Sequence, residues 1–381
     1  MQTRYLKLED YIRTGEISPA DEAKIAEAAK VLAEGGLVAF PTETVYGLGG
    51  DARRPDVSRR IYEAKGRPSD NPLIVHIADP DGMGPLASYI SADCRKMMDA
   101  CWPGPMTLVV NKTELIPHET TGGLDTVAVR MPVHKVAREL IRLSGVPVAA
   151  PSANRSGRPS TTTAAHCVED LDGRVDVILD GGPCDIGVES AIFDVTGDRA
   201  VILRPGAVTR EMAAKVLGYV PEEDKAVKGP LSAGEKPKAP GMKYRHYAPK
   251  APVLLVLPDA EGFDKIKRIV AAEMAQGKKA EVICSDECAA FLRSNFDNAV
   301  RLGTDDHSNS GTDFDGDRNN VLIRTIGSRD DRLSLAHNLF SALRETDADD
   351  IDIIVAEGFS EDELGRAIMN RLKKAAGWNT I

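Results

Sequence analysis

The sequence predicts an α/β protein in which a large twisted mixed sheet with flanking helices precedes a smaller three-layer, Rossmann-like α/β domain. Before residue 222, short apolar runs outnumber helical stretches and alternate with Gly/Pro-rich turns, which favours a mixed sheet over a doubly wound dinucleotide fold. After Pro249, strands alternate with helices, which predicts parallel βαβ units. The intervening residues are rich in Lys, Pro, Gly, Glu and Ser and lack apolar periodicity, as linkers do. We therefore expect a first domain at 1–221, a linker at 222–250 and a second domain at 251–381.

The first domain is expected to open with a helix from Pro19 to Glu34. Ser18 is suited to be its N-cap, a proline occupies its first position, and Gly35-Gly36 end it. A strand follows directly, and others come after it along the chain. These strands are expected at Leu37–Phe40, Leu73–Ile77, Thr107–Asn111, Thr126–Arg130, Val146–Ala150, Val175–Leu179, Ser190–Val195 and Ala200–Leu203.

Strand and helix patterns alternate through the second domain. The strands are expected at Val253–Leu257, Ala280–Ser285, Ala299–Leu302, Asn320–Ile326 and Ile351–Ala356. The helices are expected at Ala260–Gln276, Asp286–Asn295, Leu333–Thr346 and Glu361–Ala375. This alternation is typical of a three-layer domain with a parallel sheet.

The overall charge argues against a protein that binds nucleic acid over its whole surface. The 381 residues carry a formal net charge of -10, whereas neutralising phosphates needs clustered Lys and Arg. The six cysteines form no C-x-x-C pair and are sparse for this length, so we expect no disulfide framework. The segment from Met1 to Pro19 is polar, and the apolar runs are too short to span a bilayer. We expect a cytoplasmic protein that does not engage a membrane.

The familiar nucleotide signatures are absent from the sequence. It has no G-x-x-x-x-G-K-[ST], no G-x-G-x-x-G between strand and helix, and no G-x-S-x-G elbow. The first domain instead carries polar clusters rich in Gly and Pro at the ends of its expected strands, where ligand sites of open sheets gather. The clusters are PTETVYGL from Pro41, KGRP from Lys65, NPL from Asn71, WPGP from Trp102, PSANRSG from Pro151 and RPG from Arg204. Arg130 is a further polar residue at a strand end. Prolines and glycines fix such loops, so hydroxyl and guanidinium groups are held in place without a metal cage.

Cations are concentrated between Arg53 and Arg67. This segment holds six Lys and Arg residues against two acidic ones in a chain that is acidic overall. Up to Arg60, these cations also fit an ordinary solvated helix face. Lys65 and Arg67 are expected in a turn because each precedes a glycine or a proline, and a rigid turn with two cations suits a polyphosphate.

In order and approximate spacing, these clusters resemble the YrdC-like domain. The matching runs are PTETVYGL, KGRP followed by NPL, WPGPMTLVV, VAVRMP, PSANRSG, DGG and RPG. The segment PGMKYRHYAP at Pro240–Pro249 resembles the linker of the two-domain L-threonylcarbamoyladenylate synthases. Near the end of the chain, LFSALRETD and GRAIMNRLKKAA resemble their C-terminal domain, so the resemblance covers nearly the whole chain.

The resemblance implies an enzyme that makes L-threonylcarbamoyladenylate and pyrophosphate from L-threonine, bicarbonate or CO2, and ATP with Mg2+. The product would serve the threonylcarbamoyladenosine modification of tRNA through a downstream threonylcarbamoyl transferase complex. Stable binding of tRNA by this chain is not expected. Two negatively charged partners, the carbamate and the α-phosphate, have to meet, so cations and backbone dipoles must offset their repulsion.

The resemblance also assigns site residues by motif. The threonine contacts that it implies are Thr44, His76, Arg130, the Ala150 backbone and Ser190. The ATP contacts that it implies are Lys65, Arg67, Asn71, Thr126, Ser152, Ser160, Arg204, Arg245 and Tyr247. Arg130 would pair with the threonine carboxylate in a fork geometry, and Lys65 and Arg67 would be the catalytic cations. No protein-bound metal is implied. Where the family pattern has a threonine after Ser190, this chain has Ala191.

The linker content favours a role beyond spacing. Met242–Tyr247 holds two aromatic residues and three potential cations, which is unusual for a spacer. We expect this segment to close over bound ATP and to shield a labile mixed anhydride from water. A chain ending near Val220 would then fold but lose most of its activity. The alternative is an ordered linker packed on the second domain.

Two other functions fit parts of the sequence. An RNA-binding or ribosome-maturation module without chemistry would use the basic segment Arg53–Arg67, but the overall acidity and the 5% aromatic content stand against it. A different carbamoyl transfer, as in hydrogenase-maturation proteins with a similar domain, would require zinc-finger-like Cys pairs and an acylphosphatase region. The sequence has neither.

Overall fold

The computed structural model describes residues 2–229, 237–242, 246–297, 299–302, 321–348 and 350–381. These residues form two compact units. The first unit comprises Met1–Ser156 and Ser160–Tyr244, and the second comprises Gly157–Pro159 and Arg245–Ile381. Among the described residues, no helix has the length and apolar content needed to cross a membrane.

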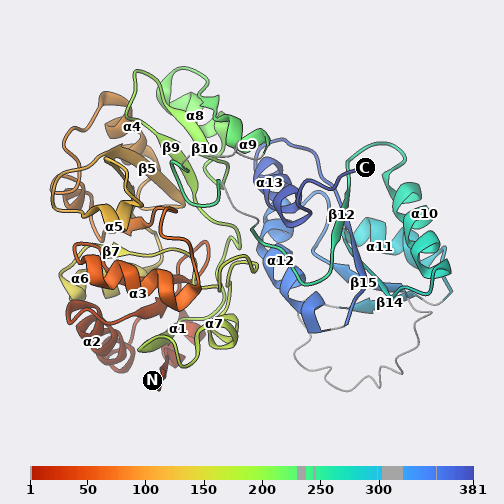
Figure 1. The fold of residues 1–381 in the computed structure, drawn as a ribbon, viewed down its shortest axis with the longest axis horizontal. Helices are drawn as coiled ribbons and strands as arrows, with labels where there is room; N and C mark the ends of the chain where they lie inside the picture. The colour runs from red at the N-terminus through yellow and green to blue at the C-terminus, as the bar shows by residue number, and fades with distance from the viewer. Residues whose placement is uncertain (1, 230–236, 243–245, 298, 303–320, 349) are drawn as a thin grey trace. The chain divides into compact units, whose positions relative to one another are not determined.

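An eleven-stranded mixed sheet forms the centre of the first unit (Figure 1). Its strand order is β1-β8-β2-β3-β7-β4-β6-β5-β9-β10-β11. The strands are β1 (Arg4–Lys7), β2 (Val38–Phe40), β3 (Gly47–Asp51), β4 (Ile74–His76), β5 (Met106–Asn111), β6 (Thr126–Arg130), β7 (Val148–Ala149), β8 (Val177–Asp180), β9 (Ala191–Asp194), β10 (Val201–Arg204) and β11 (Glu222–Glu223). Parallel and antiparallel pairs stand side by side, since β6 pairs parallel with β4 and antiparallel with β5. The prediction of a large mixed sheet with flanking helices is confirmed.

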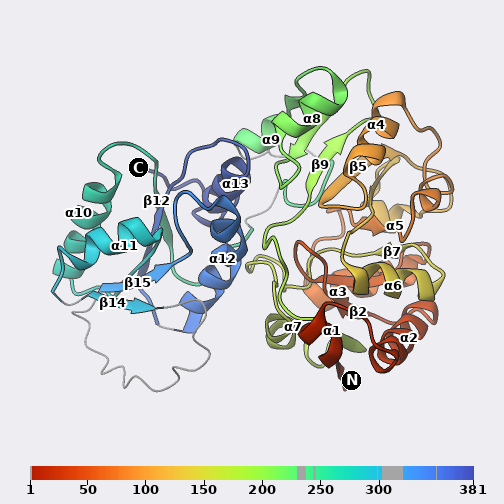
Figure 2. The same cartoon turned by 180° about the vertical axis from the view of Figure 1, so that it is seen from behind.

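Helices cover both faces of this sheet. They are α1 (Glu9–Thr14), α2 (Pro19–Ala33), α3 (Pro55–Lys65), α4 (Ala92–Cys101), α5 (His118–Thr121), α6 (Lys135–Ser144), α7 (Ala164–Leu171), α8 (Arg210–Leu217) and α9 (Lys225–Lys228), with a 3-10 turn at Pro80–Met83. Helices α2 and α6 lie beside each other on one face (Figure 2). Leu32 and Leu140 from these helices pack there with Phe40 and Val148. On the opposite face, α3, α4, α7 and α8 share a second core.

Strand β3 was not among the expected strands because its sequence, GLGGD, has three glycines and a low strand propensity. It forms because it is buried between β2 and β7 and pairs antiparallel with both. A Cβ on Gly49 would lie 2.8 Å from the Phe40 ring and 2.9 Å from Val148. Glycine therefore allows the β3 backbone to approach the core beneath α2 and α6.

The segment expected to be a linker begins with regular structure. Strand β11 pairs parallel with β10, and α9 follows at once. Ala226 of α9 is almost fully buried against the sheet. Residues 222–228 are therefore an integral part of the first unit.

The second unit is a three-layer α/β domain built on a five-stranded parallel sheet. Its order is β12-β16-β13-β15-β14. The strands are β12 (Val253–Val256), β13 (Ala280–Cys284), β14 (Ala299–Leu302), β15 (Val321–Thr325) and β16 (Ile353–Glu357), and the helices are α10 (Gly262–Ala275), α11 (Asp286–Arg293), α12 (Arg332–Glu345) and α13 (Gly365–Ala375). Helices α10 and α11 cover one face, and α12 and α13 cover the other (Figure 1). The three-layer prediction is confirmed, whereas the narrower Rossmann-like label stays a prediction.

Candidate active site

Site residues form a row across neighbouring strands of the first unit. Residues that pair directly in a sheet point to the same face, and the pairs here run His76 to Arg130, Arg130 to Thr107, and onward through Ile192 to Arg204. We call this side of the sheet the site face. It is the side covered by α2 and α6 farther along the sheet, because His76 pairs with Val148 of their core.

Ser190 and Arg204, assigned by motif to threonine and to ATP, contact each other on the site face. The Arg204 Nη2 group donates to Ser190 Oγ at 3.2 Å and its Nε donates to the Ser190 carbonyl at 3.0 Å. Ser190 Oγ also lies 2.7 Å from Thr107 Oγ1. Ala191, where the family pattern has a threonine, is fully buried in the opposite core, so the missing hydroxyl is not one of the groups on the site face.

A buried ion pair fixes the other end of the row. Arg130 Nη2 donates to Glu43 Oε1 at 2.6 Å, and both side chains are almost fully buried. Glu43 lies in the loop between β2 and β3, directly before Thr44. Thr44 is itself buried, 3.0 Å from Thr42 through the two hydroxyls.

Two neutral histidines flank this ion pair. Burial, reinforced by the nearby Arg130 charge, lowers the pKa of His76 to about 3. Burial also lowers the pKa of His134 to about 4, although the Glu43 charge acts in the opposite direction. His76 is further held by a 3.2 Å contact between its Nδ1 and the Ile74 carbonyl. At neutral pH the positive charge of this region therefore comes from the guanidinium group of Arg130.

Lys65 is the last residue of α3 and is buried, so the expectation that it lies in a turn was wrong. Gly66, with φ of 63°, ends the helix just after it. The Lys65 ammonium donates to the Ser152 carbonyl at 2.5 Å and also to the Asn154 carbonyl. Lys65 thus ties α3 to the PSAN loop that follows β7, and its burial means that it also contributes to the fold.

Arg67 does lie in the turn after α3. Its Nη2 donates to the Pro72 carbonyl at 3.2 Å and its Nε to the Asn71 carbonyl at 3.4 Å. In the PSAN loop, Ser152 donates to Asn154 Oδ1 at 2.5 Å. The turn that holds Arg67 and the PSAN loop both lie at the start of β4. The Ala150 backbone amide, which directly precedes the PSAN loop, donates to the Ile74 carbonyl of this strand at 2.8 Å.

The remaining assigned residues are distributed around this centre. Ser160 donates to Glu189 Oε1 at 2.7 Å, directly beside Ser190. Thr126 lies at the opposite end of β6 from Arg130, about 13 Å along the strand at roughly 3.3 Å per residue. Tyr247 belongs to the second unit, where its ring packs 5.0 Å from that of Phe340, and Arg245 lies outside the described residues.

Buried polar atoms without a partner mark the same region. Among the residues that the structure describes, those of the first unit all lie at or beside assigned site residues. They are Glu43 Oε2, Asn71 Oδ1, Arg130 Nε, His134 Nδ1 and Thr161 Oγ1. A buried polar group without a hydrogen bond costs about 1–3 kcal/mol, and more when it is charged. Such groups need a hydrogen-bond partner, which an ordered water or a polar ligand supplies.

The described part of the expected linker covers part of the site face. Ala239 and Met242 are almost fully buried and pack with Ile74 of β4, Ala128 of β6 and Ile192 of β9. Residues 237–242 therefore run over the same face that carries Thr126, Arg130 and Ser190.

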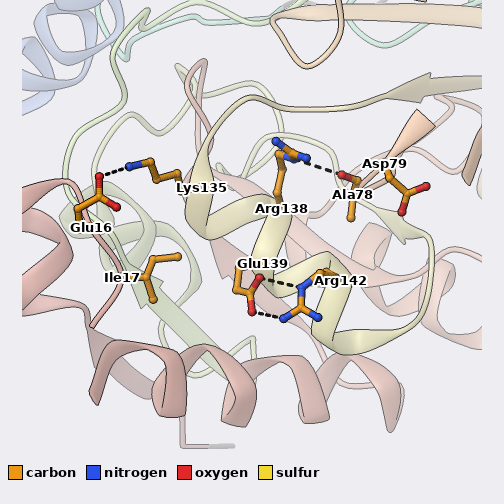
Figure 3. Close-up of a pocket in the computed structure, with 8 residues that line it drawn as sticks. All are labelled: Glu16, Ile17, Ala78, Asp79, Lys135, Arg138, Glu139 and Arg142. Atoms are coloured by element: carbon orange, nitrogen blue, oxygen red, sulfur yellow. Dashed lines mark hydrogen bonds and ion pairs between the residues drawn. The ribbon is translucent and has the colours of Figure 1, made fainter. Parts of the chain in front are cut away.

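A separate pocket of about 410 Å³ lies beside α6 and is lined by none of the assigned residues. Its cations already have partners, as Figure 3 shows: Lys135 pairs with Glu16 at 2.5 Å, and Arg142 pairs with Glu139 at 2.5 Å. Arg138 donates to the Ala78 carbonyl at 3.2 Å. Because these charges are compensated within the pocket, it does not compete with the site face as a place for ATP.

One group of potential metal ligands, Cys284, Cys288 and Glu357, lies in the described part of the second unit. Burial, together with the neighbouring Cys288, raises the pKa of the Cys284 thiol well above its usual value. Glu357 accepts from Arg329 Nε at 2.5 Å and from the Ser285 backbone at 2.7 Å. A protonated thiol and a carboxylate already engaged by an arginine are poor metal ligands.

Gly206 gives a test of the site-face geometry. A Cβ at this position would lie 2.2 Å from the Ala191 nitrogen and 2.8 Å from the Ser190 carbonyl carbon, so the backbone that carries Ser190 would have to move. We expect Gly206→Ala to cost about 1–3 kcal/mol of folding free energy, measured by urea denaturation, and to reduce turnover at the same time. Gly84→Ala is the control, because its Cβ would meet only the Asp81 carbonyl, at 3.7 Å. Normal turnover in a folded Gly206→Ala protein would contradict the placement of Ser190.

The buried histidines predict a pH dependence of stability. In the unfolded chain a histidine has a pKa of about 6.5, whereas His76 and His134 have folded-state values of about 3 and about 4. Between these limits the unfolded state binds protons that the folded state excludes, so stability is complete above pH 6.5 and falls as the pH is lowered. The expected loss is about 1.4 kcal/mol per pH unit for each histidine. Urea denaturation between pH 7.5 and 5 measures it, and His134→Asn should reduce the slope; an unchanged slope would contradict a neutral, buried His134.

Comparison with known proteins identifies the family. Residues 30–206 match the family model described as "Telomere recombination", and residues 208–377 match the one described as "Threonylcarbamoyl-AMP synthase, C-terminal domain". Threonylcarbamoyl-AMP synthase of Pyrococcus abyssi is 45% identical over 362 residues, which cover 95% of this chain and 96% of the relative. The Bacillus subtilis enzyme of the same name is 42% identical over 370 residues, 97% of each chain.

The solved structures agree with this result. The crystal structure of P. abyssi Sua5 complexed with L-threonine superposes with a TM-score of 0.83 at 43% identity, covering 100% of this chain and 99% of that chain. A Sua5 variant from the same organism, with a histidine and a tyrosine replaced by alanine, gives 0.84 at 42% identity. The match of fold and sequence over the full length confirms the resemblance found in the motifs. The chain therefore belongs to the threonylcarbamoyl-AMP synthase family.

Proposed function

We propose that the site face of the first unit joins L-threonine, bicarbonate or CO2, and ATP into threonylcarbamoyl-AMP and pyrophosphate. The observation that carries this proposal is the set of unpartnered buried polar atoms at or beside the motif residues, which includes atoms of Glu43, Arg130 and Asn71. A ligand that completes them must offer both acceptors and donors over several ångströms. An amino acid next to a nucleotide meets that requirement.

Threonine occupies the end of the row at Arg130. The guanidinium group faces the substrate carboxylate, as fork geometry favours, and Thr44, His76, Ser190 and the Ala150 backbone complete the contacts. His76 is neutral and so does not add to the positive charge. The relative from P. abyssi that was solved with L-threonine supports an amino acid as one substrate.

ATP occupies the remainder of the face. Arg67, Asn71, Thr126, Ser152, Ser160 and Arg204 contact it, and Mg2+ enters with the nucleotide as part of the substrate. Arg204 joins the two halves because it holds Ser190 through two hydrogen bonds. The carbamate formed on threonine therefore meets the α-phosphate near this arginine, which offsets the repulsion between the two anions.

The linker acts as a lid over this site. Pro237–Met242 already packs on the site face through Ala239 and Met242. Closure of the following segment, which includes Arg245, would exclude water from the mixed anhydride. Contacts of Arg245 and Tyr247 with ATP stay predictions. A chain ending near Val220 would also remove Ala226 and expose the core under it, so point substitutions are the cleaner test of the lid.

Lys65 has a structural part in this proposal as well as an electrostatic one. Removing its ammonium leaves the carbonyls of Ser152 and Asn154 without their charged donor. We expect Lys65→Ala to lower the free energy of unfolding by about 1–3 kcal/mol and to lower turnover at least tenfold. Lys96→Ala, at an exposed position paired with Asp93, is the control. Lost turnover with unchanged stability would instead assign Lys65 to the phosphates alone.

The experiment that tests the proposed function is a pyrophosphate-release assay with ATP, Mg2+, bicarbonate and L-threonine. We expect release only when threonine and bicarbonate are both present. Fluorescence anisotropy with labelled tRNA tests the RNA-binding alternative, for which the protein would bind tRNA and release no pyrophosphate.

In this proposal, threonylcarbamoyl-AMP is then consumed by a downstream threonylcarbamoyl transferase complex. We place the enzyme in the cytoplasm with its tRNA pathway.

A further inference from the structure

Glu43 is a buried carboxylate that no motif assignment uses. It lies between β2 and β3 with 2% of its surface exposed. Its backbone carbonyl accepts from the Ile186 amide at 2.8 Å, which fixes the loop at this point. Its Oε1 atom accepts from Arg130 Nη2 at 2.6 Å. The side chain is therefore held in place at the end of the row where the substrate carboxylate is proposed to bind.

The ion pair between Glu43 and Arg130 is incomplete on both sides. Within the described part of the chain, Glu43 Oε2 has no hydrogen-bond partner, and neither does Arg130 Nε. His134 Nδ1 also has no hydrogen-bond partner, and the Glu43 charge acts against the lowering of this histidine's pKa by burial. A buried pair gains stability only when its remaining lone pairs and N–H groups are satisfied. Glu43 Oε2, an acceptor, and Arg130 Nε, a charged donor, could therefore be satisfied by a molecule that carries both an ammonium and a carboxylate group.

We propose that Glu43 binds the ammonium group of the amino-acid substrate while Arg130 binds its carboxylate. An α-amino acid holds these two groups on neighbouring atoms, as the adjacent Glu43 and Arg130 side chains require. Glu43 then selects amino acids over hydroxy acids and positions the substrate nitrogen. The inference rests on the proposed placement of threonine at Arg130.

The test is a comparison of two ligands on two proteins. Calorimetry measures the dissociation constants of L-threonine and of 2,3-dihydroxybutanoate of matching configuration, in which a hydroxyl replaces the ammonium group. We expect the native protein to prefer threonine, and Glu43→Gln to reduce this preference about 10- to 100-fold, the range for hydrogen bonds to charged groups. Because the result is a ratio of two ligands on one protein, a general loss of affinity cancels. Glu119→Gln, which removes a surface carboxylate paired with Arg59, should leave the preference unchanged.

The possible failures are distinguishable. An equal loss of affinity for both ligands in Glu43→Gln would mean that Glu43 only supports Arg130, and would overturn the inference. If the native protein does not bind threonine, or if Arg130→Ala binds it equally well, the proposed site itself fails. Should Glu43→Gln not fold, Glu43→Asp keeps the charge but withdraws it by one methylene. It should still reduce the preference at least about threefold, and an unchanged preference would contradict the inference.

Discussion

Replacing Arg130 by alanine is expected to weaken L-threonine binding by about 2–4 kcal/mol, or roughly 30- to 700-fold. The reason is that the guanidinium group is almost fully buried, so no water replaces it as the partner of the substrate carboxylate. Calorimetric titration of the variant with threonine measures the effect. Unchanged threonine affinity would remove Arg130 from the site.

The same substitution has a second consequence that must be separated from binding. It leaves the Glu43 carboxylate buried without its ion-pair partner, which commonly costs about 3–5 kcal/mol of stability. The titration is therefore done at a temperature where the variant is folded, with ATP affinity as an internal control. We expect ATP affinity to change less than about threefold, because Arg130 lies at the threonine end of the face. Equal losses for both ligands would indicate general disruption.

Introducing a charge at Ala239 is expected to detach the lid and to reduce turnover at least tenfold. Ala239 is fully buried on the site face beside Ile74 and Ile192, and an ionised carboxylate placed there without a partner costs several kcal/mol. Ala239→Glu replaces the apolar contact of segment 237–242 with a buried charge, so it should release this segment while the sheet stays folded. Steady-state pyrophosphate release measures turnover, and circular dichroism checks the fold.

A neighbouring surface position provides the matched control for the lid. Lys238 is exposed and lies 3.7 Å from Asp224, so Lys238→Gln changes charge in the same segment without disturbing its buried side. It should retain turnover within about twofold, as surface substitutions do. Full turnover in a folded Ala239→Glu protein would show that the packing of segment 237–242 on the site face is not needed for synthesis.

The strands of the candidate site could be predicted largely from local sequence. Thr126–Arg130 was predicted with its observed bounds, because alternating β-branched residues lie between turn signals. Strand β3 was not, since its glycines serve a close approach to Phe40 that exists only in the folded sheet. Local propensity indicates strands where side chains favour them, and tertiary packing decides the exceptions.

The site residues divide in a similar way. Arg130, Ser190 and Arg204 were found because each belongs to a recognisable motif at a strand end, and the structure places them on one sheet face. Lys65 was misplaced because Gly66 was taken as part of a turn, although a glycine at this position commonly ends a helix and leaves the preceding residue helical. The partner of Glu43 could not be predicted, because its contact with Arg130 joins residues 87 positions apart.

The most direct test of the central claim traces a 13C label from bicarbonate into the product. The enzyme is incubated with 13C-bicarbonate, L-threonine and Mg-ATP, and the products are separated and identified by mass spectrometry. If the carbamate and the α-phosphate meet on this one sheet face, a single product contains the labelled carbon, threonine and AMP, and Arg130→Ala makes far less of it while still binding ATP. Formation of this product by Arg130→Ala at the native rate, or release of pyrophosphate without any labelled adenylate, would contradict the account.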